Sequence, residues 1–514
     1  MEKIKQNTHK EGRSISMKLK QFLLTKKLKT QLVISGLFII SIYIAAFIYS
    51  KPIIDTDYLA QLNKINIPEN YKPEDNAWLY YQKALELYKE PDFGNEYSII
   101  MDNYYKDFFD FNDTEQEIIT KWIEQNQPAW EEFSKASLKP YFYFKYEIQE
   151  LDETFPYSGL ITALDLPDLM KIGIPQIGTL RPISFLCRWR VNMYSAKANT
   201  QKAVEDSFTL LKAAFHFQEN ILLNVQLVGL ASHSIGIESL LKIVSENELS
   251  LSMLEDIQNR LNDMYKSHPI IINLEGEKIT FYDIVQYMFT KGGLGGGHLI
   301  PKSIPILIPM TSVVISMGEP DPSPTRKEKL MFVALSMLHT RRNKTIAKYN
   351  EIFEQMQKMQ EMTPYEVKQS GYSTGLNPPS VFNYRIHFSS FTKQSRNFLI
   401  SIFTPAMERL SQMIQERRTE YEATITILAL KRYRIEKGSH PENLQELLEA
   451  GYITKIPIDP YSNKPLVYRK EGDDFILYSV GEDFKDDGGK SDSSTVKWRT
   501  SSNKPGDAVF WPVQ

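Results

Sequence analysis

Apolar residues recur along most of the chain at the three- and four-residue spacing of amphipathic helices. Between Asp75 and Lys89, one face carries apolar residues at this spacing: Trp78, Tyr81, Ala84, Leu85 and Tyr88. Longer stretches of the same kind run from Pro182 to about Tyr265, with only short turns between them. Short turns make consecutive helices antiparallel neighbours. The pattern therefore predicts a mainly α fold built on an antiparallel α-helical array.

Polar residues mark the expected helix ends. Asp75 is a candidate N-cap, and Thr114 opens a Thr-x-x-Glu capping box. Asn199 and Ser250 precede two of the longer helices and are predicted to cap them. Gly438 is predicted to end a long helix in the left-handed conformation.

An uninterrupted apolar stretch near the N-terminus predicts a transmembrane helix. Residues 30–50 are 21 uncharged residues, which reach about 30 Å as a helix, one hydrocarbon thickness. Residues 1–29 carry nine basic and two acidic side chains, a net charge of +7. The positive-inside rule then places residues 1–29 in the cytoplasm and residues 51–514 outside it.

Two alternatives compete with this single span. A cleaved signal peptide has an apolar core of about 7–15 residues, shorter than this one, and no clean A-x-A site follows. A buried helix of a soluble protein would not explain the lysines gathered on one side. A second uncharged stretch, 220–237, contains several polar residues, so we expect a buried core helix there.

The shifts in pattern predict a domain organisation. Five glycines between 292 and 297, and several prolines after them, forbid a regular element over most of a strap. The expected units are a cytoplasmic basic tail (1–29), a transmembrane helix (30–50), a tether (51–73), a helical body (74–290), a Gly/Pro-rich strap (291–325), a helix and loop (326–391), and a long helix plus a small β domain (392–514).

Composition removes several classes of protein. The 514 residues have a net charge of -3, which argues against a nucleic-acid partner recognised by bulk charge. A single cysteine, Cys187, permits no intrachain disulfide and no cysteine-based metal centre.

The last hundred residues follow a pattern of their own. After the helix ending at Gly438, strands are predicted at 466–468 and 475–480, joined by a turn at 471–474. An acidic, glycine-rich loop follows from Asp483 to Gly489, and the tail from Asp507 could return as a strand beside it.

This region, 415–514, resembles the C-terminal part of the major pseudopilin of type II secretion systems. The matching pieces are the helix-to-turn string 429–447, the turn 459–465, the strand 475–481 and the acidic loop 483–489. The resemblance implies a small α+β pseudopilin-like domain. The whole chain also looks like large membrane-anchored bacterial envelope proteins that join a helical body to this domain.

The N-terminus departs from the pseudopilin pattern. That family has a cleaved Gly-Phe-Thr-Leu-x-Glu leader, whereas Gly36-Leu37-Phe38 is followed by no glutamate, and several hundred residues separate the span from the domain. We therefore do not expect polymerisation into a fibre.

The resemblance also implies a calcium site in the acidic loop. Calcium takes 6–8 oxygen ligands, about what carboxylates and carbonyls of a bent loop supply. The candidate ligands are Asp483, Asp486, Asp487 and Asp507. The spacing is not that of an EF-hand, because Lys485 stands where that motif needs Asp or Asn. The alternative is an ordinary solvated acidic turn.

Catalytic motifs are weak. Residues 371–375 match G-x-S-x-G around Ser373, but no strand pattern precedes them and two prolines follow, so we expect an ordinary loop. No histidine pair has metal-binding spacing. His216 and His233 could meet across neighbouring helices, although a buried core histidine is the commoner case. The glycines at 292–297 lack the Gly-Lys-Ser/Thr of a phosphate loop.

These patterns favour a non-enzymatic, single-pass protein of the bacterial cytoplasmic (inner) membrane. Its role would be extracytoplasmic binding or envelope assembly, with the membrane and other envelope proteins as partners. One alternative is an extracytoplasmic hydrolase with its site between the helical body and the loop 291–298, recognisable by a cleft near His298 or His339. Another is a secretion-system-associated component.

Overall fold

The computed structural model describes residues 25–513, apart from residues 28, 43, 104, 105 and 107 and the segments 149–166, 173–176, 293–295, 308–325, 372–395, 404–406, 492–496 and 499–505. The described chain is mainly helical, with one small antiparallel sheet of three strands.

An apolar helix, Thr25–Ile48, precedes the body. The body begins with α2 (Tyr58–Asn66), η1 (Pro73–Asp75), α3 (Trp78–Leu87), α4 (Asn95–Tyr97), η2 (Ser98–Asp102), η3 (Phe108–Asp110), α5 (Asp113–Gln125), α6 (Gln127–Ser137), η4 (Asp168–Lys171), α8 (Ile177–Ala196), α9 (Thr200–Gln218), α10 (Leu223–Glu246), α11 (Leu251–Ser267) and α12 (Glu275–Met288). It continues with η5 (Pro301–Leu307), α14 (Arg326–Leu338), α15 (Arg342–Met359), α16 (Pro364–Ser370), α18 (Phe398–Phe403), α19 (Met407–Lys437), α20 (Leu444–Glu449), β1 (Val467–Glu471), β2 (Asp474–Ser479) and β3 (Ala508–Trp511).

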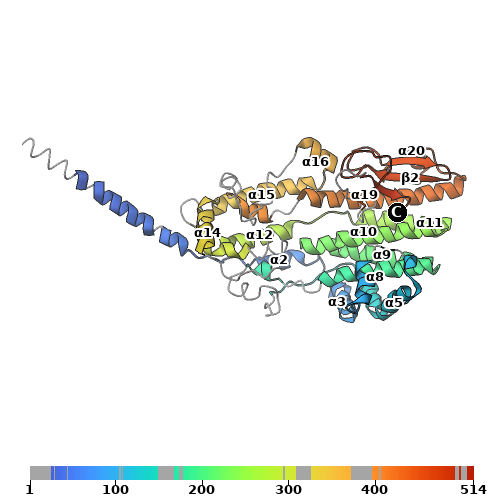
Figure 1. Ribbon diagram of the computed structural model, residues 1–514, viewed down its shortest axis with the longest axis horizontal. Coiled ribbons are helices and arrows are strands. Elements are labelled where there is room, and N and C mark those ends of the chain that lie inside the picture. The colour runs from blue at the N-terminus through green and yellow to red at the C-terminus, as the bar shows by residue number, and fades with distance from the viewer. Residues whose placement is uncertain are drawn as a thin grey trace, which may run out of the picture.

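The helices of the body run along one long axis and are stacked in layers across it. The layer of α3, α5 and α6 lies against α8 and α9, then come α10 and α11, then α19, and the sheet with α20 covers the far side of α19 (Figure 1). Helices α8, α9 and α10 contact one another pairwise. At Gly229 of α10, an added Cβ would lie 2.6 Å from the backbone nitrogen of Gln218. The absence of a side chain there lets α9 and α10 approach closely.

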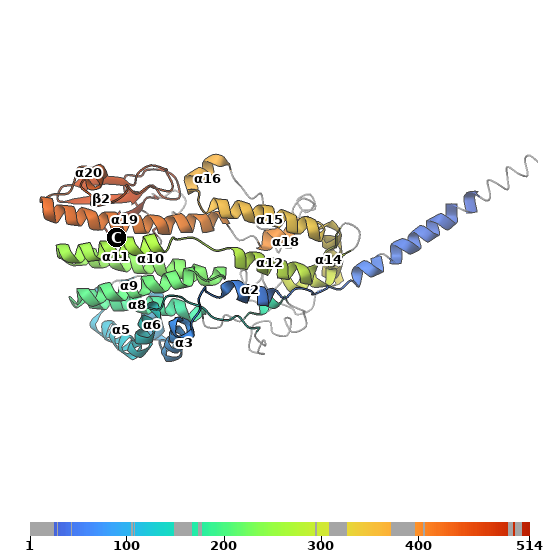
Figure 2. The ribbon, with the colours of Figure 1, turned by 180° about the vertical axis from the view of Figure 1, so that it is seen from behind.

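Among the described residues, two helices are long and apolar enough to cross a membrane. The helix Thr25–Ile48 extends away from one end of the body, as the views from both sides show (Figures 1 and 2). The second, α10, has 61% of its most apolar window buried inside the protein. The prediction of a core helix over 220–237 is confirmed.

The segment 51–73, predicted as a tether, is docked on the body over part of its length. Helix α2 lies in it and packs against α12, with Leu62 fully buried. The side chain of Gln286 on α12 accepts a hydrogen bond from the N–H of Thr56 (3.3 Å) and donates one to its carbonyl (3.0 Å).

Several helix ends differ from the prediction. Asn199 and Ser250 cap their helices as expected, and Gly438 ends α19 with a φ of 81°. Asn112, not Thr114, makes the capping box with Glu115. Asp75 does not cap α3 either, since it lies in η1.

The helix predicted at the start of the segment 326–391 is broken after α14. The N–H of Thr340 donates to the carbonyl of Arg396 (2.9 Å), and its hydroxyl contacts the same carbonyl and Thr345. Arg341 is extended, with ψ of 153°, and α15 starts after it. This long-range pairing, which no local pattern reveals, interrupts the helix.

The sheet has the order β1-β2-β3 with both pairs antiparallel. β1 and β2 form the predicted hairpin, and the tail from Asp507 returns as β3 beside β2. After β2 the chain turns at Gly481, where φ is 72° and an added Cβ would lie 1.9 Å from the carbonyl oxygen of Gly506. Only glycine fits where these two chain segments cross.

Candidate functional site at the acidic loop

The return of β3 brings the end of the chain against the acidic loop. Asp483, Asp486 and Asp487 lie in the loop after β2, and Asp507 immediately precedes β3. The backbone N–H of Asp507 donates to the carbonyl of Lys490 (3.2 Å), which fixes the two segments side by side.

Asp507 is the centre of this arrangement. Its carboxylate is fully buried and accepts hydrogen bonds from the backbone N–H groups of Asp487 (3.1 Å), Gly489 (2.7 Å) and Lys490 (3.3 Å). Burial raises the pKa of Asp507 to about 6, against the lowering effect of these N–H groups, and the nearby Asp486 and Asp487 raise it further. One carboxylate thus closes the whole loop.

The other predicted ligands are engaged separately. Asp487 accepts from the N–H of Gly506 (3.0 Å), reciprocating the contact with Asp507. Asp486 accepts from the hydroxyl of Tyr478 (2.8 Å) and from a loop N–H. Asp483 accepts from the N–H of Lys485 (3.0 Å) in a local turn. The structure therefore joins Asp487 and Asp507 directly, whereas Asp483 bonds only within its own turn among the contacts described.

This geometry does not fit a calcium ion as it stands. Among the residues that the structure describes, no group of three or more His, Cys, Asp or Glu side chains is arranged to hold a metal. Calcium needs oxygen ligands, whereas the groups that converge on Asp507 are N–H donors. Calcium binding stays a prediction, and it would require the loop to rearrange.

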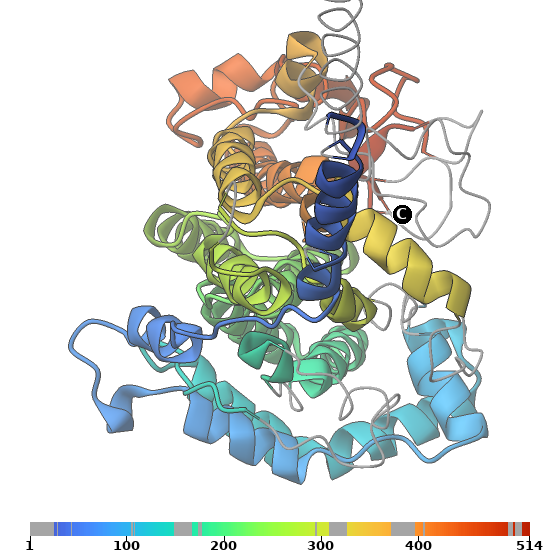
Figure 3. The same cartoon turned by 90° about the vertical axis from the view of Figure 1, so that its left-hand side faces the viewer.

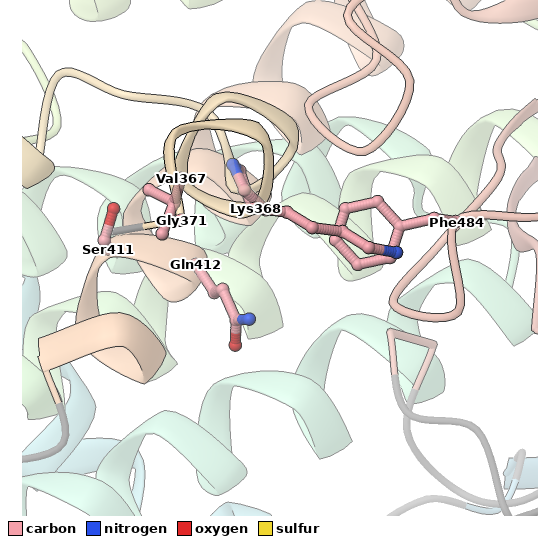
Figure 4. Close-up of a pocket in the computed structure, with 7 residues that line it drawn as sticks. Val367, Lys368, Gly371, Ser411, Gln412 and Phe484 are labelled. Carbon is pink, nitrogen blue, oxygen red and sulfur yellow. The ribbon is translucent and has the colours of Figure 1, made fainter. Parts of the chain in front are cut away.

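A cavity of about 350 Å³ lies beside the loop (Figure 4). It is lined by Pro364, Val367, Lys368, Gly371, Ser411, Gln412 and Phe484. Phe484 has a φ of 65° and follows the predicted ligand Asp483 in the loop, while the Lys368 amine is 3.6 Å from the centre of its ring. The loop thus supplies a wall of the cavity, and α16 and α19 supply the rest.

Buried polar side chains of α19 bind the segments around the C-terminal sheet. Glu416 accepts from the hydroxyl of Tyr461 (2.9 Å), and Glu420 accepts from the indole N–H of Trp498 (2.7 Å). Arg417 pairs with Glu420 at 2.9 Å, and burial raises the pKa of that carboxyl. No sequence pattern marks these buried carboxylates, because charged side chains recur along much of α19.

A second cavity, of about 390 Å³, opens between α11, α19 and the segment before β1. Its charged groups neutralise one another: Glu422 pairs with Lys455 and accepts from the hydroxyl of Tyr265 (3.1 Å). Arg418 donates to the carbonyl of Ile270 (3.0 Å). These contacts join α19 to the helical body and to the segment before β1.

The G-x-S-x-G segment lies at the edge of the described chain. Gly371 ends α16 with a φ of 61°, so a helix and not a strand precedes the motif. Ser373 lies outside the described residues.

The core histidines have separate partners. His216 accepts from the hydroxyl of Tyr81 (2.9 Å) and donates to a backbone carbonyl, while His233 contacts the hydroxyl of Tyr421 (2.9 Å). Burial lowers the pKa of His216 to about 4 and that of His233 to about 3.

The loop 291–298, where a hydrolytic site was the alternative, contacts the base of the N-terminal helix. His298 stacks on Phe47, with ring centres 4.4 Å apart, and contacts the hydroxyl of Ser50 (3.3 Å). His339 is buried in the core and donates to the carbonyl of Thr340 (2.8 Å). The contacts of His298 thus attach the N-terminal helix to the body.

Comparisons of the chain with protein-family models, with curated proteins and with solved structures found no match. The pseudopilin resemblance therefore rests on the residues of this chain alone.

Proposed function

We propose that this protein is a single-pass, membrane-anchored binding or assembly protein of the bacterial envelope, with its body outside the cytoplasm. The observation that carries the proposal is the N-terminal helix. It leaves the body with apolar side chains exposed along its length, as with Leu32 at 65% and Phe38 at 66%. Such a surface is stable in lipid and not in water.

The attachment of the helix supports an anchoring role. Phe47 is 4% exposed and packs on His298, and Lys302 lies 4.9 Å from the ring centre of Tyr49. Asp55 forms an ion pair with Lys291. These contacts couple the helix to the body, so the body has a defined position relative to the anchor.

The binding part of the proposal concerns the C-terminal domain. It lies on the half of the body away from the N-terminal helix (Figure 1), and the Phe484 cavity opens at its junction with α16. The lining is mostly apolar with one exposed amine, Lys368, which suits a small apolar group beside an anion. A role beside a secretion system rests on the pseudopilin resemblance and remains a secondary proposal.

Topology is the direct test. Alkaline phosphatase, which is active only outside the cytoplasm, is fused after Gln514, and the full chain is expressed in a bacterial host. We expect an active fusion, because the +7 flank stays in the cytoplasm. A matched fusion before Met1 should be inactive. An inactive C-terminal fusion, with the protein present in membranes, would overturn the proposal.

A further inference from the structure

Helix α14 lies at the end of the body from which the N-terminal helix emerges. Viewed from that end, it runs crosswise to the long axis of the molecule (Figures 1 and 3). A helix in this position would run along the surface of a membrane that the N-terminal helix enters.

The two sides of α14 differ sharply. On the inner side, Phe332 and Leu335 are at most 6% exposed and Ser336 is buried. On the outer side, at i, i+7 and i+8 spacing, Leu330 is 70% exposed, Met337 53% and Leu338 40%. Large apolar side chains gathered on one exposed helix face mark an interaction surface.

The position of this face is fixed relative to the anchor. The backbone N–H of Ile300 donates to the carbonyl of Met288 (2.8 Å) and closes the loop that carries His298. His298 in turn stacks on Phe47 of the N-terminal helix. η5 follows at Pro301 and packs against α14. The chain directly after the anchor is apolar as well, with Ile53 56% exposed.

Charge points to the same partner. Three exposed basic residues lie on elements of this end: Lys51 directly after the anchor, Lys302 in η5 and Arg326 at the start of α14. Basic side chains beside an apolar strip are the composition of interfacial helices on anionic lipid.

We propose that the outer face of α14, formed by Leu330, Met337 and Leu338, is a second membrane contact that lies in the lipid interface beside the anchor. The contact rests on the proposed anchoring, because the anchor sets its height. Its occupant is the lipid of the same bilayer. With two contacts, the body cannot tilt freely about a single helix.

The test places an environment-sensitive fluorophore on single cysteines of the full chain in vesicles of anionic lipid. Met337→Cys reports the contact and Phe38→Cys the anchor. Leu138→Cys is the control, since Leu138 is 68% exposed and directly follows α6, a helix that lies away from the anchor end (Figure 2). The native Cys187 is fully buried and stays unlabelled. Lipids that carry a quencher on the acyl chain should reduce the Met337→Cys signal about twofold or more, because interfacial helices insert to the acyl boundary.

The outcomes separate the two proposals. We expect quenching at positions 337 and 38 and none at 138, with Leu330→Cys repeating the result from another turn of α14. Quenching at 38 without quenching at 337 overturns the second contact and leaves the anchor intact. No quenching at 38 overturns the anchoring and the second contact together. A label at 337 that is shielded from aqueous iodide but untouched by lipid quencher would mean that a protein covers the face, which also overturns the lipid contact.

Discussion

Removal of the Asp507 carboxylate should open the acidic loop. In Asp507→Ala, the N–H groups of Asp487, Gly489 and Lys490 lose a shared acceptor that lies 2.7 to 3.3 Å away. A buried donor left without a partner costs about 1–3 kcal/mol. Water reaches a surface loop, so we take the lower end for each of the three groups, about 3 kcal/mol in all.

The effect should be local. A cost of about 3 kcal/mol corresponds to roughly a hundredfold faster exchange of the loop amides, at about 1.4 kcal/mol per factor of ten. Hydrogen exchange on the detergent-solubilised full chain measures this in peptides covering 482–491, with peptides of α9 as the internal reference. Asp507→Asn should fall between wild type and Asp507→Ala, because the amide oxygen keeps part of the accepting role.

Asp483→Ala is the matched control. Its carboxylate accepts one hydrogen bond in a partly exposed turn, so loop exchange should change by less than about threefold, as for an ordinary surface substitution. If Asp507→Ala behaves like this control, Asp507 does not hold the loop and the reasoning above is wrong.

Three further predictions concern the core histidines, the contact between α9 and α10, and calcium. Burial lowers the pKa values of His216, His233 and His339 from 6.5 to about 4, 3 and 4, respectively. The stability that these neutral histidines contribute above pH 6.5 is lost as the pH falls toward those values. The melting temperature should therefore drop between pH 6.5 and 4, and less steeply in His216→Gln. In Gly229→Ala, helix propensity favours Ala by about 1 kcal/mol, but the new Cβ meets backbone at 2.6 Å, so circular dichroism should show a lower melting temperature. If the loop rearranges around calcium, the ion should raise the melting temperature of the full chain over that in chelator, and Asp486→Ala should remove most of that gain; equal curves would end the calcium prediction.

Local patterns predicted the helices and the hairpin because each depends on neighbouring residues. Asn199 and Ser250 bond to N–H groups three residues away, and Gly438 needs only its own φ of 81°. The stretch that forms α10 is apolar enough to be buried, and its polar residues favour the protein interior over lipid. A core helix could therefore be predicted there. The tail from Asp507 was predicted to return as a strand beside the acidic loop, and β3 does lie there.

Contacts between distant residues were beyond that reach. Glu416 meets Tyr461 45 residues later, and Glu420 meets Trp498 78 residues later. From the sequence, both glutamates look like residues of a solvated helix face. The hydrogen bonds of Asp507 were likewise not predictable, because its carboxylate accepts from N–H groups of residues 17 to 20 positions earlier. A carboxylate's role depends on which atoms face it, and only the tertiary structure supplies them.

The contacts between the N-terminal helix and the body bear on how the C-terminal sheet could act in the proposed function. With the N-terminal helix as the proposed anchor, a free tether of the predicted length, 51–73, would let the body move over a wide range of heights and angles above the bilayer. Instead α2 packs on α12, Asp55 pairs with Lys291, and Phe47 is buried against His298. The sheet then lies on the half of the body away from the N-terminal helix, and the Phe484 cavity lies where its loop meets α16 (Figure 1). In the proposed function, this attachment would hold the C-terminal sheet in a fixed orientation relative to the membrane, which suits recognition of a partner fixed in the envelope better than capture of one that diffuses freely.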